Sequence, residues 1–362
     1  MPLALVALPA AADRIDVYPR DANADCDEPF EKAANALKPG DELVVHDGVY
    51  TQSCARRISV KGTAENPIVI RAADGARPTL TRPDANRDTH NNIEIVDSAH
   101  LVIRGLRFFG GSIGVRFIGG QDIVFEHNEV SATDSSAVTM NSGNATRMTV
   151  RHNHIHHAGQ GRNGPTTGEG LYIGCNRAKC VVSDSRFEHN HIHDLRATSD
   201  GGNDGIEIKP GSGGNLVQHN WIHDTTDGRA YPCILVYGGA APNVVRHNRL
   251  ERCGEAIQAV ADALITDNIV IDASISGFAS YPHVQVGAPR NLTVRNNRFV
   301  RHPVCAQLDW REATDVVFED NTLLCEDSTA VAARGLNNAV INNNLYTGTN
   351  ATPHDGLVRY EH

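Results

Sequence analysis

The chain has 362 residues and a formal net charge of −10 at neutral pH; only 5% of its residues are aromatic, whereas 32 are glycine. The negative charge, with no stretch rich in lysine and arginine, argues against a nucleic-acid partner. Abundant glycine, with asparagine and aspartate at regular intervals, is typical of many short strands joined by tight turns. We therefore expect an all-β protein.

The first twelve residues form an apolar run, MPLALVALPAAA, that ends in an Ala-x-Ala pattern without the usual basic residues before it. We interpret residues 1–12 as the remnant of a signal peptide and residues 13–362 as a single domain. The protein is thus expected to be secreted or periplasmic. No later segment has the length of a membrane span, so we expect no membrane partner.

Eight cysteines fall into neighbouring pairs, which are Cys26 with Cys54, Cys175 with Cys180, Cys233 with Cys253, and Cys305 with Cys325. Members of the last two pairs are 20 residues apart, close to the length of one repeat described below. Because stacked strands lie about 4.8 Å apart, a disulfide can join two such cysteines with modest adjustment. We expect four sequential disulfides in an exported protein; the alternative is a set of buried free thiols.

A short helix is predicted near the N-terminal end. Asp27 is a suitable N-cap, Pro29 suits the first turn, and the amphipathic pattern runs to about Leu37. A solenoid needs a cover over its open end to prevent edge pairing, and we expect this helix to provide it.

Nine segments share one pattern when they are aligned on an asparagine, with 20 to 37 residues between successive copies. Each segment alternates apolar and polar residues, as expected of a strand with one face inward. This repeat predicts a single-stranded right-handed parallel β-helix of about ten coils. We expect the asparagine at a bend, where it tolerates the left-handed conformation and bonds its neighbours above and below. The aligned residues are Asn128, Asn153, Asn190, Asn220, Asn248, Asn268, Asn297, Asn321 and Asn344.

A second column of short strands lies between these segments. Its predicted inward pairs are Val115/Phe117, Val138/Met140, Leu171/Ile173, Ile206/Ile208, Ile234/Val236, Ile257/Ala259 and Val284/Val286. Its outward positions form an exposed face that includes Tyr172, Glu207, Lys209, Tyr237, Gln258 and Gln285.

Four segments exceed the length of a minimal coil and must bulge out as loops. Three of them occur in successive coils: HHAGQGRNGPTTGEG, DLRATSDGGNDG and DTTDGRAYP. The fourth, DASISGFASYP, enters two coils further on. All four precede the second column, so we expect them to wall a groove over its outward residues.

Acidic residues coincide with these loops. Asp204 precedes Glu207 and Lys209, and Glu169 occupies the position equivalent to Asp204 one coil earlier. Two carboxylates stacked one coil apart must share a proton or a cation. Ca²⁺ is the expected cation in a secreted protein because it prefers oxygen ligands; the alternative is a surface ladder of ion pairs. The candidate ligands are Glu169, Asp204, Asp200 and Asn203.

Several segments resemble the β-helical polysaccharide lyases typified by chondroitinase B and alginate lyases. They are GDELVVHDGVY, GTAENPIVIRA, HLVIRGLRFFGG and IEIKPGSGGNLVQHNWIHDTT. In that family a strand lysine is preceded by acidic calcium ligands, with more ligands from the preceding coil. Lys209 matches the lysine, Asp204 the calcium-binding acid, and Glu169 falls near the preceding-coil ligand. The resemblance implies β-elimination on a uronate, in which calcium neutralises the carboxylate, the lysine removes the C5 proton and an arginine assists.

This chain departs from the family pattern at two positions. Tyr237 stands where the arginine is expected, so either Arg229 reaches in from the preceding loop or Tyr237 acts as the acid. Gly202 replaces the second acid two residues before Asp204. Glu207 beside Lys209 favours the protonated lysine, so either Glu207 also binds the metal or Lys209 merely pairs with it.

Eighteen histidines include the runs HNHIHH and HNHIHD, in which alternate residues such as His152, His154 and His156 share one side of a strand. They suggest a zinc site. We favour a repeat position that requires a polar residue. Other candidate substrate contacts on the exposed face are His283 and, further along, Asp309 and Arg311 with Trp310 between them.

The favoured function is a monomeric polysaccharide lyase acting on an acidic polysaccharide. A glycoside hydrolase would instead use two of the carboxylates as acid and base. A C5 epimerase, or a binding protein without catalysis, is a further alternative.

Overall fold

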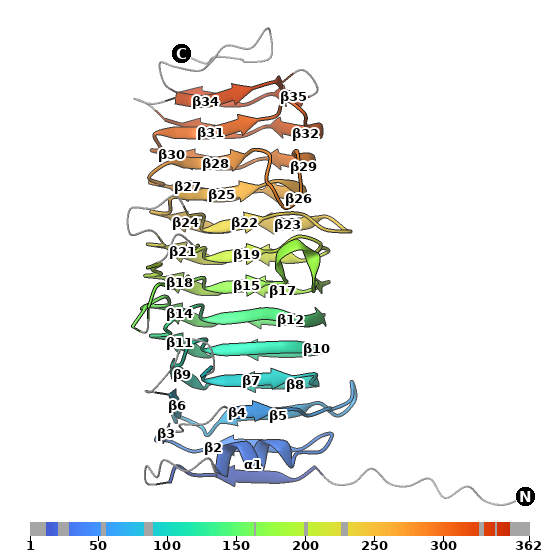
Figure 1. Ribbon diagram of the computed structural model, residues 1–362, viewed down its shortest axis with the longest axis vertical. Helices are drawn as coiled ribbons and strands as arrows, with labels where there is room; N and C mark the ends of the chain where they lie inside the picture. The colour runs from blue at the N-terminus through green and yellow to red at the C-terminus, as the bar shows by residue number, and fades with distance from the viewer. Residues whose placement is uncertain are drawn as a thin grey trace, which may run out of the picture.

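A computed structural model describes residues 12–20, 29–51, 56–82, 90–162, 164–198, 202–225, 231–325, 329–336 and 339–347. The chain winds into coils that stack along one long axis, from β1 at one end to β36 near the other (Figure 1). Strands of neighbouring coils pair in parallel, and β1 (Arg14–Val17) starts the stack against β2.

The coils contribute strands to three faces, and in two coils one long strand runs from the first face into the second. The first face is built from β4 (Arg56–Ile58), β7 (Ile93–Val96), the first parts of β10 (Val115–Glu126) and β12 (Val138–Thr146), β15 (Leu171–Ile173), β19 (Ile206–Ile208), β22 (Ile234–Val236), β25 (Glu255–Ala259), β28 (Ser276–Ser280), β31 (Val304–Asp309) and β34 (Thr329–Arg334).

The second face follows it in every coil. Its strands are β2 (Glu42–Val45), β5 (Ile68–Ala72), β8 (Ala99–Arg104), the later parts of β10 and β12, β13 (Thr149–Arg151), β16 (Val182–Ser183), β17 (Arg186–Glu188), β20 (Leu216–Gln218), β23 (Asn243–Arg246), β26 (Ala261–Thr266), β29 (Arg290–Arg295), β32 (Thr314–Glu319) and β35 (Ala339–Asn342).

The third face completes the coil. Its strands are β3 (Val49–Thr51), β6 (Thr79–Arg82), β9 (Arg107–Gly110), β11 (Glu129–Ser131), β14 (His154–His156), β18 (His191–His193), β21 (Trp221–His223), β24 (Arg249–Glu251), β27 (Ile269–Ile271), β30 (Arg298–Val300), β33 (Thr322–Leu324) and β36 (Leu345–Thr347).

Among the described residues, the third face has twelve strands, one per coil, which is slightly more than the ten coils expected. The additional coils lie before the first repeated asparagine, where β3 and β6 form without that residue. The expected inward positions are confirmed in all coils but one, which is described below. Residues such as Ile206, Ile234 and Ile257 stack on one another and are fully buried. Each such side chain contributes about 1.5–3 kcal/mol through burial.

The repeated asparagines form a buried ladder between the second and third faces. Nδ2 of Asn220 donates to Oδ1 of Asn248 at 3.0 Å, and Oδ1 of Asn220 accepts from Nδ2 of Asn190 at 3.0 Å. The bonding to neighbours above and below is thus confirmed. The expectation that the asparagine itself has the left-handed conformation was wrong. The residue before each asparagine has it instead, as at His189 (φ 56°) and His219 (φ 55°).

One coil departs from the predicted strand positions. The segment expected to run inward at Val284 and Val286 is a turn, and Val284 is 96% exposed. The strand of that coil is β28, which lies within the segment that we expected to be a loop. Residues 281–289 instead leave the stack, and we call this segment the strap.

A short helix, α1 (Pro29–Asn35), lies at the N-terminal end of the stack, as expected (Figure 1). Disulfides join Cys175 to Cys180, Cys233 to Cys253, and Cys305 to Cys325. The predicted pair of Cys26 and Cys54 lies outside the described residues. Within the part of the chain that the structure describes, no helix has the length and apolar character needed to cross a membrane.

Candidate active site

A cavity of about 600 Å³ lies over the middle of the first face, and we call it the first cavity. Its floor is formed by β15, β19 and β22, and its walls come from the segments that link the third face to the first face. The structure brings together most of the residues that the sequence singled out: Glu169, Tyr172, Asp204, Glu207, Lys209, Tyr237, Gln258 and His283 all line this cavity.

Strand register explains why these side chains meet. Tyr172 pairs with Glu207, Glu207 with Leu235, and Leu235 with Gln258, so one outward row crosses four coils. The backbone N–H of Tyr237 donates to the carbonyl of Ile208 at 3.1 Å, which continues this register past the strand ends. Tyr237 therefore stands one coil on from Lys209, as the sequence alignment predicted.

Lys209 is held by an ion pair and two aromatic rings. Its ammonium donates to Oε1 of Glu207, and Nζ lies 4.4 Å from the ring centroid of Tyr172 and 5.3 Å from that of Tyr237. The hydroxyl of Tyr237 also donates to the Glu207 carboxylate. The ammonium is thus fixed by a carboxylate and by cation–π contacts in a site shielded from water.

Three carboxyl groups converge on this lysine from two coils. Glu169, Asp204 and Glu207 are each no more than 3% exposed. Oγ of Ser136 donates to Oε2 of Glu169 at 2.5 Å, whereas Oδ1 of Asp204 is buried without a hydrogen-bond partner among the described residues. A Cβ at Gly202 would lie 2.7 Å from Oδ2 of Asp204 and 3.7 Å from Oε1 of Glu169, so glycine keeps the space beside both carboxyl groups open.

Burial dominates the acid–base properties of these groups. It raises the pKa of Glu169, and it raises that of Asp204 well above the usual range, with the nearby carboxylates adding to the effect. The pKa of Glu207 is raised to about 7 by burial, although Lys209 acts in the opposite direction. Burial also raises the pKa of both Tyr172 and Tyr237, so their hydroxyls keep their protons. The cavity can therefore hold protons or a cation on its carboxyl groups.

The strap closes one side of the first cavity. The ring of His283 packs edge-on against Tyr237 at 4.7 Å between centroids, and Val286 packs against a small apolar cluster of Leu235, Tyr237 and Val260. At its tip, Oε1 of Gln285 accepts from the backbone N–H of Arg177 at 2.9 Å. The expected exposed-face position of Gln285 is thus corrected: its side chain anchors a loop rather than facing outward from a strand.

A second cavity, of about 690 Å³, lies further along the first face, beside β31 and β34. Asp309 and Arg311 line it and form an ion pair, with 2.7 Å between Nη2 and Oδ2. Trp310 was expected to stack on sugar, but it is 1% exposed and its indole N–H donates to Oγ of Ser280 at 2.9 Å. Tyr281 lines both cavities and donates to Oε2 of Glu255 at 3.0 Å.

One further candidate, Asn203, does not join the first cavity. Asn203 is fully buried and does not line it, because its Nδ2 donates to the backbone carbonyls of Leu195 and Thr225. Asp200 and Arg229 lie outside the described residues.

Some lining residues were missed at the sequence level. Tyr281 begins the strap, Asn176 lies in the 3₁₀ turn η1 (Asn176–Ala178), and Ser136 lies one coil before Glu169. The position of Ser136 was available from the alignment of GEGLYIG with its preceding coil. The contribution of Tyr281 was hidden because its segment was assigned to the wrong part of the coil.

The fold and the spacing of the site can now be compared with known proteins. The family model described as right handed beta helix region matches residues 44–191, 92–261 and 166–323, which together span most of the chain. The chain belongs to the right-handed β-helix family. A search of curated protein sequences found no match.

Solved structures of β-helix proteins share this fold. An alginate lyase from Paenibacillus sp. str. FPU-7 is 18% identical with a TM-score of 0.60, over 91% of this chain and 99% of that one. A mannuronic acid specific polysaccharide family 6 lyase from human gut microbiota is 15% identical, with a TM-score of 0.57 and coverage of 93% and 86%. The catalytic domain of a GH87 alpha-1,3-glucanase is 11% identical, with a TM-score of 0.60 and coverage of 92% and 67%. At these identities the likeness concerns the fold.

Proposed function

We propose that this protein is a secreted carbohydrate-active enzyme that cleaves a uronate-containing polysaccharide by β-elimination. The observation that carries the proposal is the buried Lys209, held between two tyrosines and beside three carboxyl groups in the first cavity. The structural likeness to an alginate lyase and a mannuronic acid specific lyase supports this reading. Three disulfides support export to an oxidising compartment.

Lys209 is the proposed base. Its partner Glu207 is buried and has a pKa raised to about 7, so this carboxyl can accept the proton that Lys209 must lose before it acts as a base. The neutral amine takes the C5 proton of the uronate, the C4–O bond breaks, and a C4–C5 double bond forms. Tyr237, whose hydroxyl keeps its proton, is the proposed donor to the leaving oxygen.

Glu169 and Asp204 are the proposed calcium ligands. Their oxygens suit a hard cation, Asp204 has a buried oxygen without a hydrogen-bond partner among the described residues, and Gly202 leaves space beside both. When bound, calcium would neutralise the substrate carboxylate and so make its C5 proton more acidic. The same ion would also relieve the repulsion between the two carboxylates.

The first experiment measures the absorbance of unsaturated uronate products with alginate, pectate, glucuronan and sulfated glycosaminoglycans, in calcium and in EDTA. We expect an increase with one polymer that is abolished in Lys209→Ala. Lys179→Ala changes an exposed lysine near the cavity and is the matched control, which should retain activity. A reaction unaffected by Lys209→Ala would overturn the assignment of Lys209 as the base. A reaction that EDTA abolishes but that Asp204→Asn leaves unchanged would overturn the assignment of Asp204 as a calcium ligand.

A glycoside hydrolase is the second candidate, because burial raises the pKa of Asp204 well above its usual range, in the direction that a general acid requires. The likeness to an alpha-1,3-glucanase supports it. Hydrolysis produces reducing ends without the new double bond. Reducing ends without ultraviolet absorbance, lost in Asp204→Asn, would therefore replace the lyase with a hydrolase.

A further inference from the structure

A group of histidines lies on the third face, around the corner from the first cavity. Strand register aligns His154 with His191 and then Trp221, and aligns His156 with His193 and then His223. These strands immediately precede the long segments that wall the first cavity. Five histidines from three neighbouring coils therefore share one outward surface.

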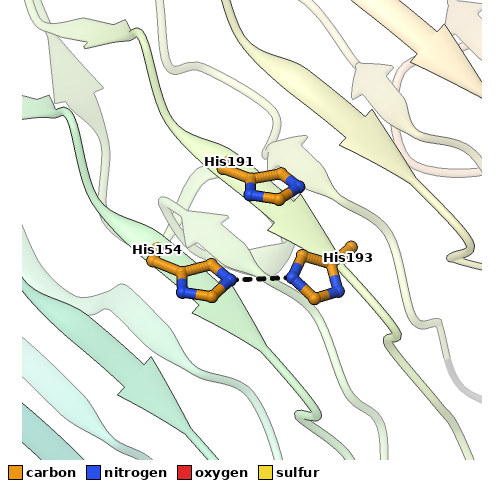
Figure 2. Close-up of side chains that lie close together, drawn as sticks. All are labelled: His154, His191 and His193. Atoms are coloured by element: carbon orange, nitrogen blue, oxygen red, sulfur yellow. Dashed lines mark hydrogen bonds between the residues drawn. The ribbon is translucent and has the colours of Figure 1, made fainter.

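Ring nitrogens in this group face one another (Figure 2). Nε2 of His154 lies 2.8 Å from Nε2 of His193, and the nitrogens available from His154, His191 and His193 all lie within 4.8 Å of one another. Nε2 of His191 likewise lies 2.8 Å from Nε2 of His223. Tetrahedral zinc with bonds of about 2.0–2.1 Å places its ligand nitrogens roughly 3.3 Å apart. The separations among His154, His191 and His193, which include 2.8 Å and do not exceed 4.8 Å, bracket this value.

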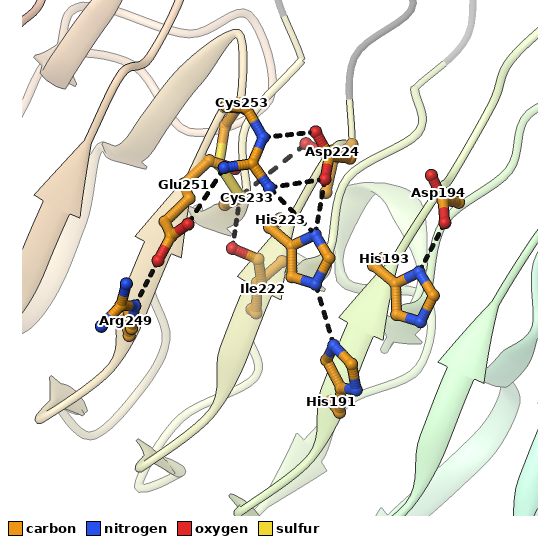
Figure 3. A network of polar contacts seen from close by, with 12 residues as sticks. His191, His193, Asp194, Ile222, His223, Asp224, Cys233, Arg249, Glu251 and Cys253 are labelled. Carbon is orange, nitrogen blue, oxygen red and sulfur yellow. Dashed lines mark hydrogen bonds and ion pairs between the residues drawn. A yellow bond between two sulfur atoms is a disulfide. The ribbon is translucent and has the colours of Figure 1, made fainter.

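The carboxylates of Asp194 and Asp224 bind one nitrogen of the His193 and His223 rings, and so leave the other ring nitrogen available to a metal (Figure 3). Nδ1 of His193 lies 2.6 Å from Oδ2 of Asp194, and Nδ1 of His223 lies 2.6 Å from Oδ2 of Asp224. Arg252 donates to both oxygens of Asp224, so this side chain is held as a carboxylate that accepts a hydrogen bond from the ring. Nδ1–H then donates to the carboxylate, and the Nε2 lone pairs of both rings face the neighbouring histidines. Carboxylate–histidine pairs of this kind orient metal ligands.

We propose that His154, His191 and His193, together with His223, bind a zinc ion on the third face. Nitrogen ligands without a carboxylate in the inner set favour zinc over calcium or magnesium. The site would tie together the coils of β14, β18 and β21, from which the walls of the first cavity emerge. It is separate from the proposed calcium ligands and does not depend on the reaction proposed above.

A second row of histidines in the same coils serves as an internal comparison. His127, His152, His189, His219 and His247 stack ring on ring with centroids 4.8–5.1 Å apart and nearly parallel planes. They occupy the left-handed positions before the asparagine ladder, where later coils have Asp267, Asn296 and Asp320. This second row fulfils our expectation of a repeat position that requires a polar residue. The rings on β14, β18 and β21 also stack along their columns, as His154 does on His191, but there the ring nitrogens of two columns face each other as well.

The test is titration of the full-length, EDTA-treated protein with Zn²⁺ by calorimetry, and with Co²⁺ by visible absorption. We expect one ion per chain, and for Co²⁺ the intense visible bands of a tetrahedral site. His191→Gln should weaken Zn²⁺ binding at least 100-fold, and Asp194→Asn about 10- to 100-fold through loss of ring orientation. His189→Asn is the matched control in the same coil, and its affinity should equal that of the unchanged protein.

Circular dichroism and thermal melting of each metal-free variant establish that it is folded. The proposal is overturned if the unchanged protein takes up no stoichiometric Zn²⁺, or if His189→Asn weakens binding as much as His191→Gln. Binding is measured without any polysaccharide, so failure of this proposal and failure of the lyase proposal give different results.

Discussion

The side-chain amide of Gln285 donates to Oδ1 of Asn176 at 3.2 Å, although 109 residues separate them in the sequence. The same glutamine accepts from the backbone of Arg177. The strap thus runs back across several coils to a turn that the Cys175–Cys180 disulfide closes. The width of the first cavity therefore depends on a contact between two loops, in addition to the rigid strands below it.

Gln285→Ala removes both hydrogen bonds of the strap tip. We expect KM for the polysaccharide to rise several-fold with little change in kcat, because His283 and Val286 lose their support while Lys209 does not. Steady-state kinetics on the responsive polymer measures both constants. Val284→Ala changes an exposed residue of the same turn and serves as control. An equal loss in kcat for Gln285→Ala would show that the strap positions the reacting groups as well.

The two tyrosines beside Lys209 are expected to differ in importance. Tyr237→Phe removes the hydroxyl that contacts Glu207 and is the proposed proton donor, so kcat should fall about 10²- to 10⁴-fold. Tyr172→Phe keeps the ring over the ammonium, and we expect a change of less than about tenfold. Initial rates of unsaturated product formation compare them. Equal losses in the two variants would refute the assignment of Tyr237 as the acid.

The buried carboxyl group of Glu255 should make the free energy of unfolding depend on pH. Burial raises the pKa of this carboxyl to about 7, so between about pH 4.5 and 7 the folded protein binds more protons than the unfolded chain. The stability contributed by the protonated group is therefore lost as the pH rises through this window. Glu255→Gln keeps an acceptor for Tyr281 and should be more stable than the unchanged protein by up to about 3 kcal/mol at pH 8, with no difference near pH 4.

Urea unfolding at several pH values measures this difference. Glu312→Gln, at an exposed position, is the control and should show no such trend. A constant difference between Glu255→Gln and the unchanged protein across the range would contradict the prediction.

The asparagine ladder predicts a position-dependent loss of stability. Asn220→Ala leaves the carbonyl of Phe187 and the amide of Asn190 without their buried partner, and we expect a loss on the order of 3 kcal/mol. Asn344→Ala removes an equivalent bond to Phe318 in the last described coil, where opening is more local. Its effect on the free energy of global unfolding should be smaller. Equal losses of unfolding free energy for Asn220→Ala and Asn344→Ala, measured by denaturant unfolding, would argue against more local opening of the last described coil.

Much of the fold was predictable because the repeat encodes it. Inward residues alternate with a period of two, and asparagine marks each coil, so the strand register that places Tyr237 one coil beyond Lys209 follows from alignment alone. The convergence of Glu169 and Asp204 followed from the same reasoning. The chemical role of this cluster does not follow from register, because a buried ion pair and a catalytic pair occupy the same positions.

There is a physical reason why the sequence pattern did not reveal that residues 281–289 form the strap and not a strand. The segment HVQV alternates as a strand does, whereas the real strand β28 contains small residues with no clear alternation. A Cβ at Gly277 would lie 2.8 Å from the carbonyl oxygen of Cys305 and equally close to the ring of His302. Close packing between coils selected the small residue there, and a sequence pattern based on hydrophobicity cannot detect that constraint.

The linear arrangement of the coils determines where the protein is expected to unfold first. Each coil contacts mainly its two neighbours, so heat or mechanical stress releases the stack from its exposed ends before it reaches the middle. The first cavity lies over β15, β19 and β22. These three strands have several coils on either side of them (Figure 1). Local opening of an outer coil therefore leaves the strand pairing beneath the first cavity intact.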